Sequence, residues 1–309
     1  HYQLYNHGTS HNGTLMAIFF LCGIGCILSI IPTTSFFYND VVMGFYLIVL
    51  GIGSFSQGYT KKFVKRIAQI GNLGKNRIMK QNSFISNFKI IDLSHTLEEG
   101  IPNFPTHTKY YHLNANQIDD PAEMSQILMH EHNGTHVDAP AHYIKSGAKK
   151  KHFIEYVNPT TLIGSAVHIN LNKYKKKLVT KSTILKWEKN NCPIKKDDIV
   201  IFNFGWHKKW KLGKMGNDYI NSWPGLDLSS SKYLLRKKVC AVGTDTLGLD
   251  CSGSTNIPAH TTFLVNHVLI MENLANLDRL PIRFDFIALP LKIKKGTASP
   301  IRALALIKK

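Results

Sequence analysis

The chain has 309 residues, with 38 Lys and Arg against 20 Asp and Glu, which gives a formal net charge of +18. Its 44% hydrophobic and 19% charged residues exclude an intrinsically disordered chain, because disordered chains are poor in apolar residues. Five cysteines without paired spacing exclude a disulfide scaffold and a four-cysteine zinc module. The length allows one large domain or two small ones.

Two apolar segments stand near the N-terminus, at residues 15–31 and 41–55, and the only charged residue among residues 1–60 is Asp40. As a helix, the first would extend about 26 Å, close to the thickness of a hydrocarbon core. Basic residues follow the second segment directly, at 61–66. Because cytoplasmic flanks carry an excess of Lys and Arg, we expect a membrane hairpin through residues 15–59, with the following domain on the cytoplasmic side.

Two alternatives remain open for these first residues. The first is a secretory signal or a single anchor, which would make the following domain secreted or anchored, although residues 1–14 lack the expected cation. The second is an artefact of the gene sequence, since the chain begins with His1 rather than Met.

The composition changes after this region. Residues 1–60 carry the two hydrophobic segments, 61–87 are a basic and polar linker, and from Phe88 short runs rich in Ile, Val and Phe alternate with turn signals. We therefore predict a mixed α/β domain over residues 88–309, with buried strands separated by helices. The predicted strands are 89–92, 166–170, 199–202 and 239–242, and the predicted helices are 183–189 and 229–237.

The positive charge is scattered in short lysine runs at 149–151, 175–177 and 294–295. No aromatic and basic segment or zinc-finger spacing accompanies these runs, so we predict solvated loops and no nucleic-acid partner. A lysine-rich surface that binds anionic lipid is the alternative.

Residues 130–142 hold the most informative pattern. Gly134 and Pro140 argue against a helix here, and in an extended chain even separations place side chains on one face. Three imidazoles and a carboxylate facing a core would cost several kcal/mol, which a divalent cation relieves. The alternative is a histidine-rich surface loop, and Glu131, out of phase, is expected to point away. The residues at even separations are His132, His136, Asp138 and His142.

The spaced motif His-x-Gly-Thr-His-x-Asp-x-Pro-x-His, at residues 132–142, resembles the signature of the metal-dependent cyclase family, which includes bacterial kynurenine formamidases and isatin hydrolases. The resemblance covers roughly residues 88–309. One departure is Phe204, which stands where the family has threonine before Gly-Trp. The other similar blocks are Ile91–Leu97, Gly205-Trp206, Gly243–Asp250, Pro258–His260 and Glu272–Leu274.

The resemblance implies a swivelling β/β/α fold with one or two metal ions in each subunit. It implies that Asp138 bridges the ions of two-metal members and that His142 is the catalytic proton donor or acceptor. Imidazole and carboxylate ligands favour Zn²⁺ or Mn²⁺. From the residues alone, Pro258 opens a helix and Glu272 ends a strand, and a histidine such as His260 at a helix start is more typical of a cap. The implied metal ligands are His132, His136, Asp138, His260 and Glu272.

The activity that the resemblance implies is hydrolysis of an amide C–N bond by metal-activated water. The leading candidate reaction is hydrolysis of N-formylkynurenine to kynurenine and formate. An isatin hydrolase-like or other cyclic-amide hydrolase is the alternative within the family. A non-catalytic, membrane-tethered binding protein is the alternative of another class. We expect a small-molecule amide substrate that contacts Trp206 and Phe104, and a homo-oligomer, either a dimer or a tetramer.

Overall fold

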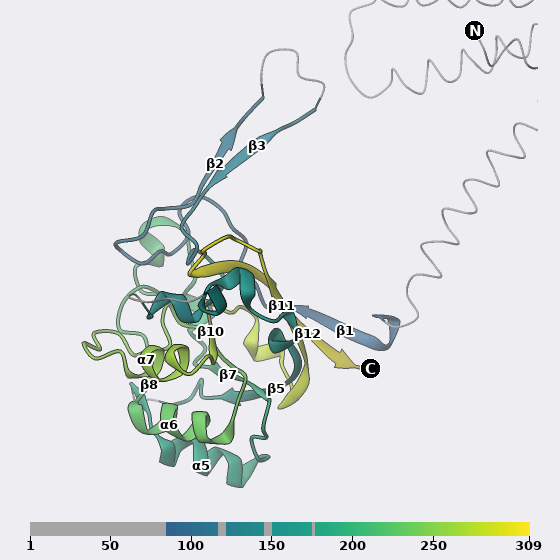
Figure 1. Cartoon of the computed structure of the whole chain (residues 1–309), viewed down its shortest axis with the longest axis vertical. Coiled ribbons are helices and arrows are strands. Elements are labelled where there is room, and N and C mark those ends of the chain that lie inside the picture. The colour runs from purple at the N-terminus through teal and green to yellow at the C-terminus, as the bar shows by residue number, and fades with distance from the viewer. Residues whose placement is uncertain (1–84, 117–121, 145–149, 175–176) are drawn as a thin grey trace, which may run out of the picture. The chain divides into compact units, whose positions relative to one another are not determined.

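One mixed sheet of curved strands forms the core of the described domain (Figure 1). The computed structural model describes residues 85–309 apart from 117–121, 145–149 and 175–176. The strands, in spatial order, are β1 (Phe88–Asp92), β12 (Ala298–Lys308), β11 (Arg283–Pro290), β5 (Ile163–Asn170), β7 (Ile199–Asn203), β9 (Ala241–Thr244), β10 (Leu269–Glu272) and β4 (His136–Asp138). β4 also pairs with the start of β12, and this second pairing closes the sheet.

Four neighbouring strands of the sheet, β5, β7, β9 and β10, run parallel. Both faces of such strands are buried, which explains their continuous apolar runs. In β7, Ile199 and Ile201 belong to one hydrophobic cluster, whereas Val200 and Phe202 belong to another. The first cluster takes side chains from all eight strands and therefore fills the inside of the closed sheet.

The second cluster lies on the outer face of the parallel strands, under three helices that pack in a row: α5 (Lys181–Asn190), α6 (Leu228–Lys237) and α7 (Pro258–Val265). The ends of α6 follow from its sequence. At the N-terminus Asp227 accepts a hydrogen bond from the Ser230 N–H at 2.8 Å, and at the C-terminus Lys238 adopts the left-handed conformation.

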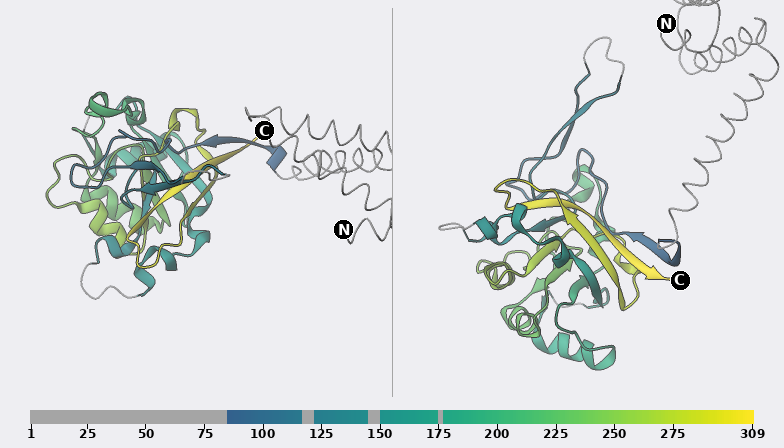
Figure 2. Two further views of the ribbon diagram at one scale, coloured as in Figure 1. Left: turned by 90° about the horizontal axis from the view of Figure 1, so that it is seen from above. Right: turned by 45° about the vertical axis from the view of Figure 1, so that its right-hand side comes forward.

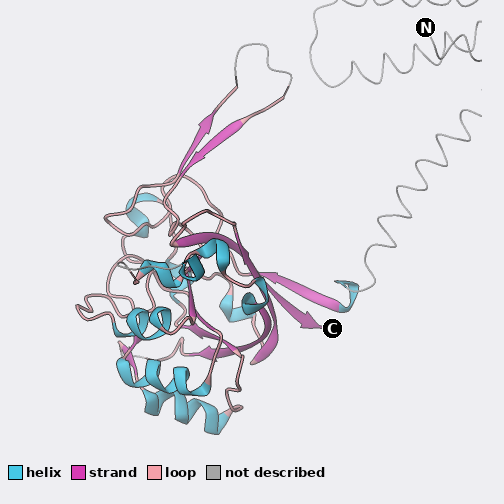
Figure 3. Ribbon diagram, in the orientation of Figure 1, coloured by secondary structure: helices cyan, strands magenta, loops and turns pink. Residues whose placement is uncertain are grey.

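Strands and loops outweigh helices in the described residues (Figure 3). The hairpin of β2 (Tyr111–Asn114) and β3 (Ser125–Leu128) extends away from the closed sheet (Figure 2), and β6 (Leu178–Val179) pairs with β8 (Gly225–Leu226). The 3₁₀ helices are η1 (Ile85–Asn87), η2 (Pro140–His142), η3 (Lys150–His152), η4 (Ile154–Tyr156), η5 (Pro159–Leu162), η6 (Trp206–Lys209), η7 (Gly213–Gly216) and η8 (Leu277–Arg279).

The prediction of a mixed α/β domain is confirmed, with a core that is mostly strand. The predicted strands 89–92, 166–170 and 199–202 lie within β1, β5 and β7, and both predicted helices lie within α5 and α6. The run 239–242 only overlaps β9, which begins at Ala241, although the Cys240 N–H also bonds to the Asp198 carbonyl just before β7.

The two predicted membrane segments, at 15–31 and 41–55, and the predicted linker lie outside the described residues, apart from the last residues of the linker. Among the residues that are described, no helix has the length and apolar character needed to cross a membrane. The domain boundaries at 60 and 88 stay a prediction.

A test of this packing is Gly225→Ala. A Cβ at Gly225 would lie 2.3 Å from the backbone N of Cys251 and 2.4 Å from the carbonyl carbon of Asp250, neither of which is a flexible group. We expect the free energy of unfolding to fall by about 1–3 kcal/mol, measured by urea titration. The control is Gly164→Ala on β5, where a Cβ meets nothing within 4 Å. Equal midpoints for the two variants would contradict the predicted packing.

Candidate metal centre

The pairing of β4 with β10 builds the centre of the site. Val137 points into the inner cluster, so His136 and Asp138 point to the opposite, outer face. The antiparallel register sets Glu272 directly opposite His136 and Ile270 opposite Asp138. Residues directly opposite one another project from the same face, so the sheet itself brings the Glu272 carboxylate to the two β4 side chains.

The helix α7 packs over β10 and carries His260 into the same space. The Nε2 atom of His260 lies 3.2 Å from Glu272 Oε1 and 3.6 Å from Asp138 Oδ2. From η2, which follows β4, the His142 ring lies with its centroid 4.2 Å from the ring of His132. The structure therefore gathers all six polar residues that the sequence singles out; their roles stay a prediction.

Two groups of side chains could each hold an ion, and both use Asp138. The first joins Asp138 to His132 and His142, and the second joins it to His136 and Glu272. In each group the ligand atoms lie within 4.8 Å of one another. In the first, His132 Nδ1 stands 2.7 Å from Asp138 Oδ1. A carboxylate shared in this way is the arrangement that a bridging ligand needs.

The ring orientations of two histidines are fixed from behind. The Nδ1 atom of His136 lies 2.9 Å from the Gly134 carbonyl oxygen, and the Nδ1 atom of His260 lies 2.6 Å from Asp250 Oδ2. Both partners only accept hydrogen bonds, so each ring donates from Nδ1. The Nε2 atom of each ring is then the one that faces the carboxylates of Asp138 and Glu272, as in histidines that bind metals.

Buried atoms without partners test whether these residues fit a cation. Within the described part of the chain, His136 Nε2 and both carboxylate oxygens of Asp138 are buried and make no hydrogen bond. Leaving such groups unpaired costs several kcal/mol. A divalent cation satisfies all three atoms at once, and a set of imidazole nitrogens and carboxylate oxygens suits Zn²⁺ or Mn²⁺. The residues fit the metal.

The electrostatics of the cluster agree with this fit. Burial by itself would raise the pKa of Asp138, but the charge of His132 and the close contacts with the His132, His136 and His260 rings hold that pKa well below its usual value. Burial by itself would lower the pKa of His260, yet the neighbouring carboxylates of Asp138, Asp250 and Glu272 raise it well above 6.5. The cluster thus favours positive charge. In contrast, burial lowers the pKa of His142 to about 4.

Three further residues that the sequence singles out can be located in the structure. As expected, Glu131 points away from the ligand cluster, and its Oε2 accepts hydrogen bonds from the Thr297 and Ala298 N–H groups. Phe104 is 41% exposed, and its ring centroid lies 5.1 Å from that of His107. The indole of Trp206 packs on the outer cluster and donates to the Tyr219 carbonyl. Their contact with substrate stays a prediction.

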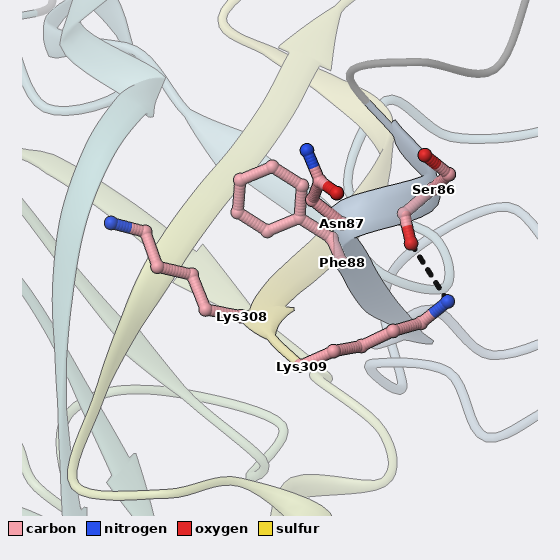
Figure 4. A pocket seen from close by; sticks show the side chains of 5 residues that line it. All are labelled: Ser86, Asn87, Phe88, Lys308 and Lys309. Atoms are coloured by element: carbon pink, nitrogen blue, oxygen red, sulfur yellow. Dashed lines mark hydrogen bonds between the residues drawn. The ribbon is translucent and has the colours of Figure 1, made fainter.

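A pocket elsewhere holds none of these residues. It is lined by Ser86, Asn87, Phe88, Lys308 and Lys309, where β1 pairs with the end of β12, and Lys309 Nζ donates to the Ser86 carbonyl there (Figure 4). The pocket is therefore separate from the histidine and carboxylate cluster.

Comparison with known proteins agrees with the geometry. The Cyclase family model matches residues 91–251. The chain belongs to the cyclase family. It is 32% identical over 200 residues to an isatin hydrolase of Roseibium aggregatum, and the matched region covers 59% of this chain and 74% of that protein. It is also 28% identical over 236 residues to a kynurenine formamidase of Erythrobacter litoralis, and this match covers 72% of this chain and 96% of that protein.

Solved structures of the cyclase fold match as well. A crystal structure of an isatin hydrolase bound to the product analogue thioisatinate superimposes with a TM-score of 0.68 and 26% identity, over 77% of this chain and 99% of that chain. The structure of isatin hydrolase A from Labrenzia aggregata, bound to benzyl benzoate, gives a TM-score of 0.67 at 26% identity. This match covers 76% of this chain and 100% of that chain. The predicted family and its type of fold are thereby confirmed.

Residues behind the ligands were not predicted from the sequence of this cyclase-family chain. Asp250 contacts His260, and Asn273 Nδ2 donates at 2.8 Å to the same Gly134 carbonyl that fixes His136. Asp250 ends a block that resembles the family, which was the one available signal, but nothing in its spacing pointed to a histidine ten residues later.

We predict that Asp138→Asn weakens metal binding in both groups, because the shared carboxylate loses its charge and one acceptor oxygen. Zinc affinity should fall by more than the roughly 10- to 100-fold typical of an outer-shell partner. The measurement is zinc content and affinity by elemental analysis and chelator competition. The control, Asp285→Asn at an exposed position of β11, should bind zinc as the parent does. Unchanged zinc binding in Asp138→Asn would refute the shared-ligand assignment.

Proposed function

We propose that this cyclase-family protein is a metal-dependent hydrolase of amide C–N bonds, with N-formylkynurenine as its first candidate substrate. The observation that carries the proposal is the pair of ligand groups that share the buried Asp138. Its similarity to kynurenine formamidases and isatin hydrolases supports the same class of reaction. All six polar positions of the family pattern are present, which argues against a binding protein with a decayed site.

His132, His136, Asp138, His260 and Glu272 would hold the metal. A bound divalent cation supplies Lewis acidity, which polarises a carbonyl and makes water more acidic. The chain's part is to fix the donor atoms before substrate arrives: the Gly134 carbonyl and Asp250 orient two of the rings, and the Leu249 N–H donates at 2.7 Å to Glu272 Oε1.

His142 is our candidate for the residue that moves protons. It is less buried than the β4 ligands and stands beside His132. Its pKa of about 4 means that its imidazole is neutral at pH 7 and can accept a proton. We propose that His142 takes a proton from the attacking water and delivers it to the departing nitrogen as the C–N bond breaks. Water adds to the formyl carbon, so the products are formate and the free amine.

A second candidate is ring opening of isatin or another cyclic amide, which the 32% identity to an isatin hydrolase favours. The same attack on an amide carbonyl applies, but the nitrogen stays attached to the product through the aromatic ring. The two candidates therefore differ in substrate and not in the chemistry required of the six residues.

The purified chain, loaded with zinc or manganese, should hydrolyse N-formylkynurenine, and a chelator should abolish the turnover. Turnover is followed by the absorbance of kynurenine and by release of formate, with isatin assayed in parallel under the same conditions. Turnover of isatin alone would replace the first candidate by the second. Turnover of neither substrate, nor of other cyclic amides, by the metal-loaded chain would refute the proposed hydrolase.

His142→Ala separates proton transfer from metal binding. We expect the variant to keep its zinc and to lose about 10²- to 10⁴-fold in kcat, the range typical of a missing general acid or base. The control is His112→Ala, at an exposed histidine of β2. Zinc loss as severe as in Asp138→Asn would instead make His142 a ligand, as its place in the first group of side chains would allow.

A further inference from the structure

Asp250 is a buried carboxylate behind the site, and the mechanism above does not require it to touch metal or substrate. Its carboxylate is 4% exposed. Among the described residues, the partners of this carboxylate lie in the first turn of α7: Oδ1 accepts from the Ala259 N–H at 2.7 Å, and Oδ2 accepts from the His260 N–H at 3.0 Å and from His260 Nδ1 at 2.6 Å. One carboxylate thus binds both the backbone and the side chain of His260.

The helix depends on this outside partner because its own sequence offers no cap. The N-cap position is Ile257, an apolar residue in the left-handed conformation with φ of 34°, and Pro258 follows at the first helical position. The first N–H groups of a helix have no partner within the helix. Asp250 supplies the missing acceptors from a different segment of the chain.

The backbone of Asp250 is itself held in place. It forms an isolated β-bridge with Leu226 of β8. The backbone at Gly225, next to Leu226, packs so closely on the Asp250 carbonyl carbon that no side chain would fit between them. The backbone that carries the carboxylate is therefore fixed, and the carboxylate in turn holds the His260 ring. The far side of that ring, Nε2, lies 3.2 Å from Glu272 Oε1 and 3.6 Å from Asp138 Oδ2.

We propose that Asp250 is the positioning residue for His260: it holds the ring in the Nδ1–H tautomer and ties it to the start of α7, so that the Nε2 lone pair enters the space shared with Asp138 and Glu272. The inference rests on the metal centre of the proposed function and not on the identity of the substrate. Carboxylates in this position behind a metal-binding histidine orient the ring and increase its basicity.

The test is Asp250→Asn. One amide oxygen can still accept from the Ala259 N–H, but the amide nitrogen then faces His260 Nδ1 and favours the opposite tautomer, with the proton on Nε2. We expect zinc affinity, measured by competition with a chromophoric chelator, to fall about 10- to 100-fold.

The matched control is Asp227→Asn, because Asp227 also caps a helix, through the Ser230 N–H at the start of α6. An asparagine caps a helix about as well as an aspartate, so this variant should keep the zinc affinity of the parent. Equal zinc affinity of Asp250→Asn and the parent would overturn the proposal, and so would an equal loss in the two variants.

The tautomer provides a second readout, which is taken on the parent chain. In the zinc-loaded parent chain, the ¹⁵N shifts of the His260 ring, assigned by its loss in His260→Gln, should show the proton on Nδ1. A proton on Nε2 would overturn the proposal even if Asp250→Asn does not fold. Both readouts concern metal binding and ring protonation, so a chain that binds zinc but hydrolyses no amide would refute the proposed function while leaving this inference standing.

Discussion

The register between β4 and β10 is the constraint on which the site depends. β4 has only three residues, and its alternation sends Val137 inward and His136 and Asp138 outward. A slip of one residue would exchange the two faces, burying the histidine and the carboxylate in the inner cluster. A strand this short cannot hold its register by its own ladder, so the neighbouring residues must fix it.

Hydrogen bonds on both sides of β4 fix its register. The Thr135 hydroxyl donates to the Asn273 carbonyl at 2.6 Å, and the Ile301 N–H donates to the Thr135 carbonyl at 3.0 Å. Asn273 has a positive φ of 57°, a conformation that asparagine tolerates better than most residues, and its amide bonds to Gly134. Gly134 has a φ of +65°, a conformation that favours glycine, and a Cβ there would press on the end of the Leu97 side chain. The same contacts that fix the register therefore also hold the carbonyl that orients His136.

The sequence predicted much of this, for identifiable reasons. The run at 199–202 is apolar at every position, which is the signature of a strand buried on both faces, and it is found as β7. The even spacing of His136 and Asp138 predicted their common face correctly, although the extended segment is only three residues long and His132 and His142 reach the site from a loop and from η2. Pairing between distant strands leaves no local trace. The approach of Glu272 to His136 across 136 residues of chain, and of Asp250 to α7, could be seen only in the fold or through the family pattern.

The histidines around Asp138 differ in how firmly they are held, and this difference bears on where chemistry takes place. His136 and His260 are buried, and each has its Nδ1 committed to a fixed acceptor. His142 lies at the less buried side of the cluster, in a 3₁₀ turn that ends the β4 segment. A group that must exchange protons with water and substrate needs access, whereas a ligand needs a fixed lone pair. The burial of these three histidines therefore matches the roles proposed for them, with the two ligands buried and the proton carrier partly exposed.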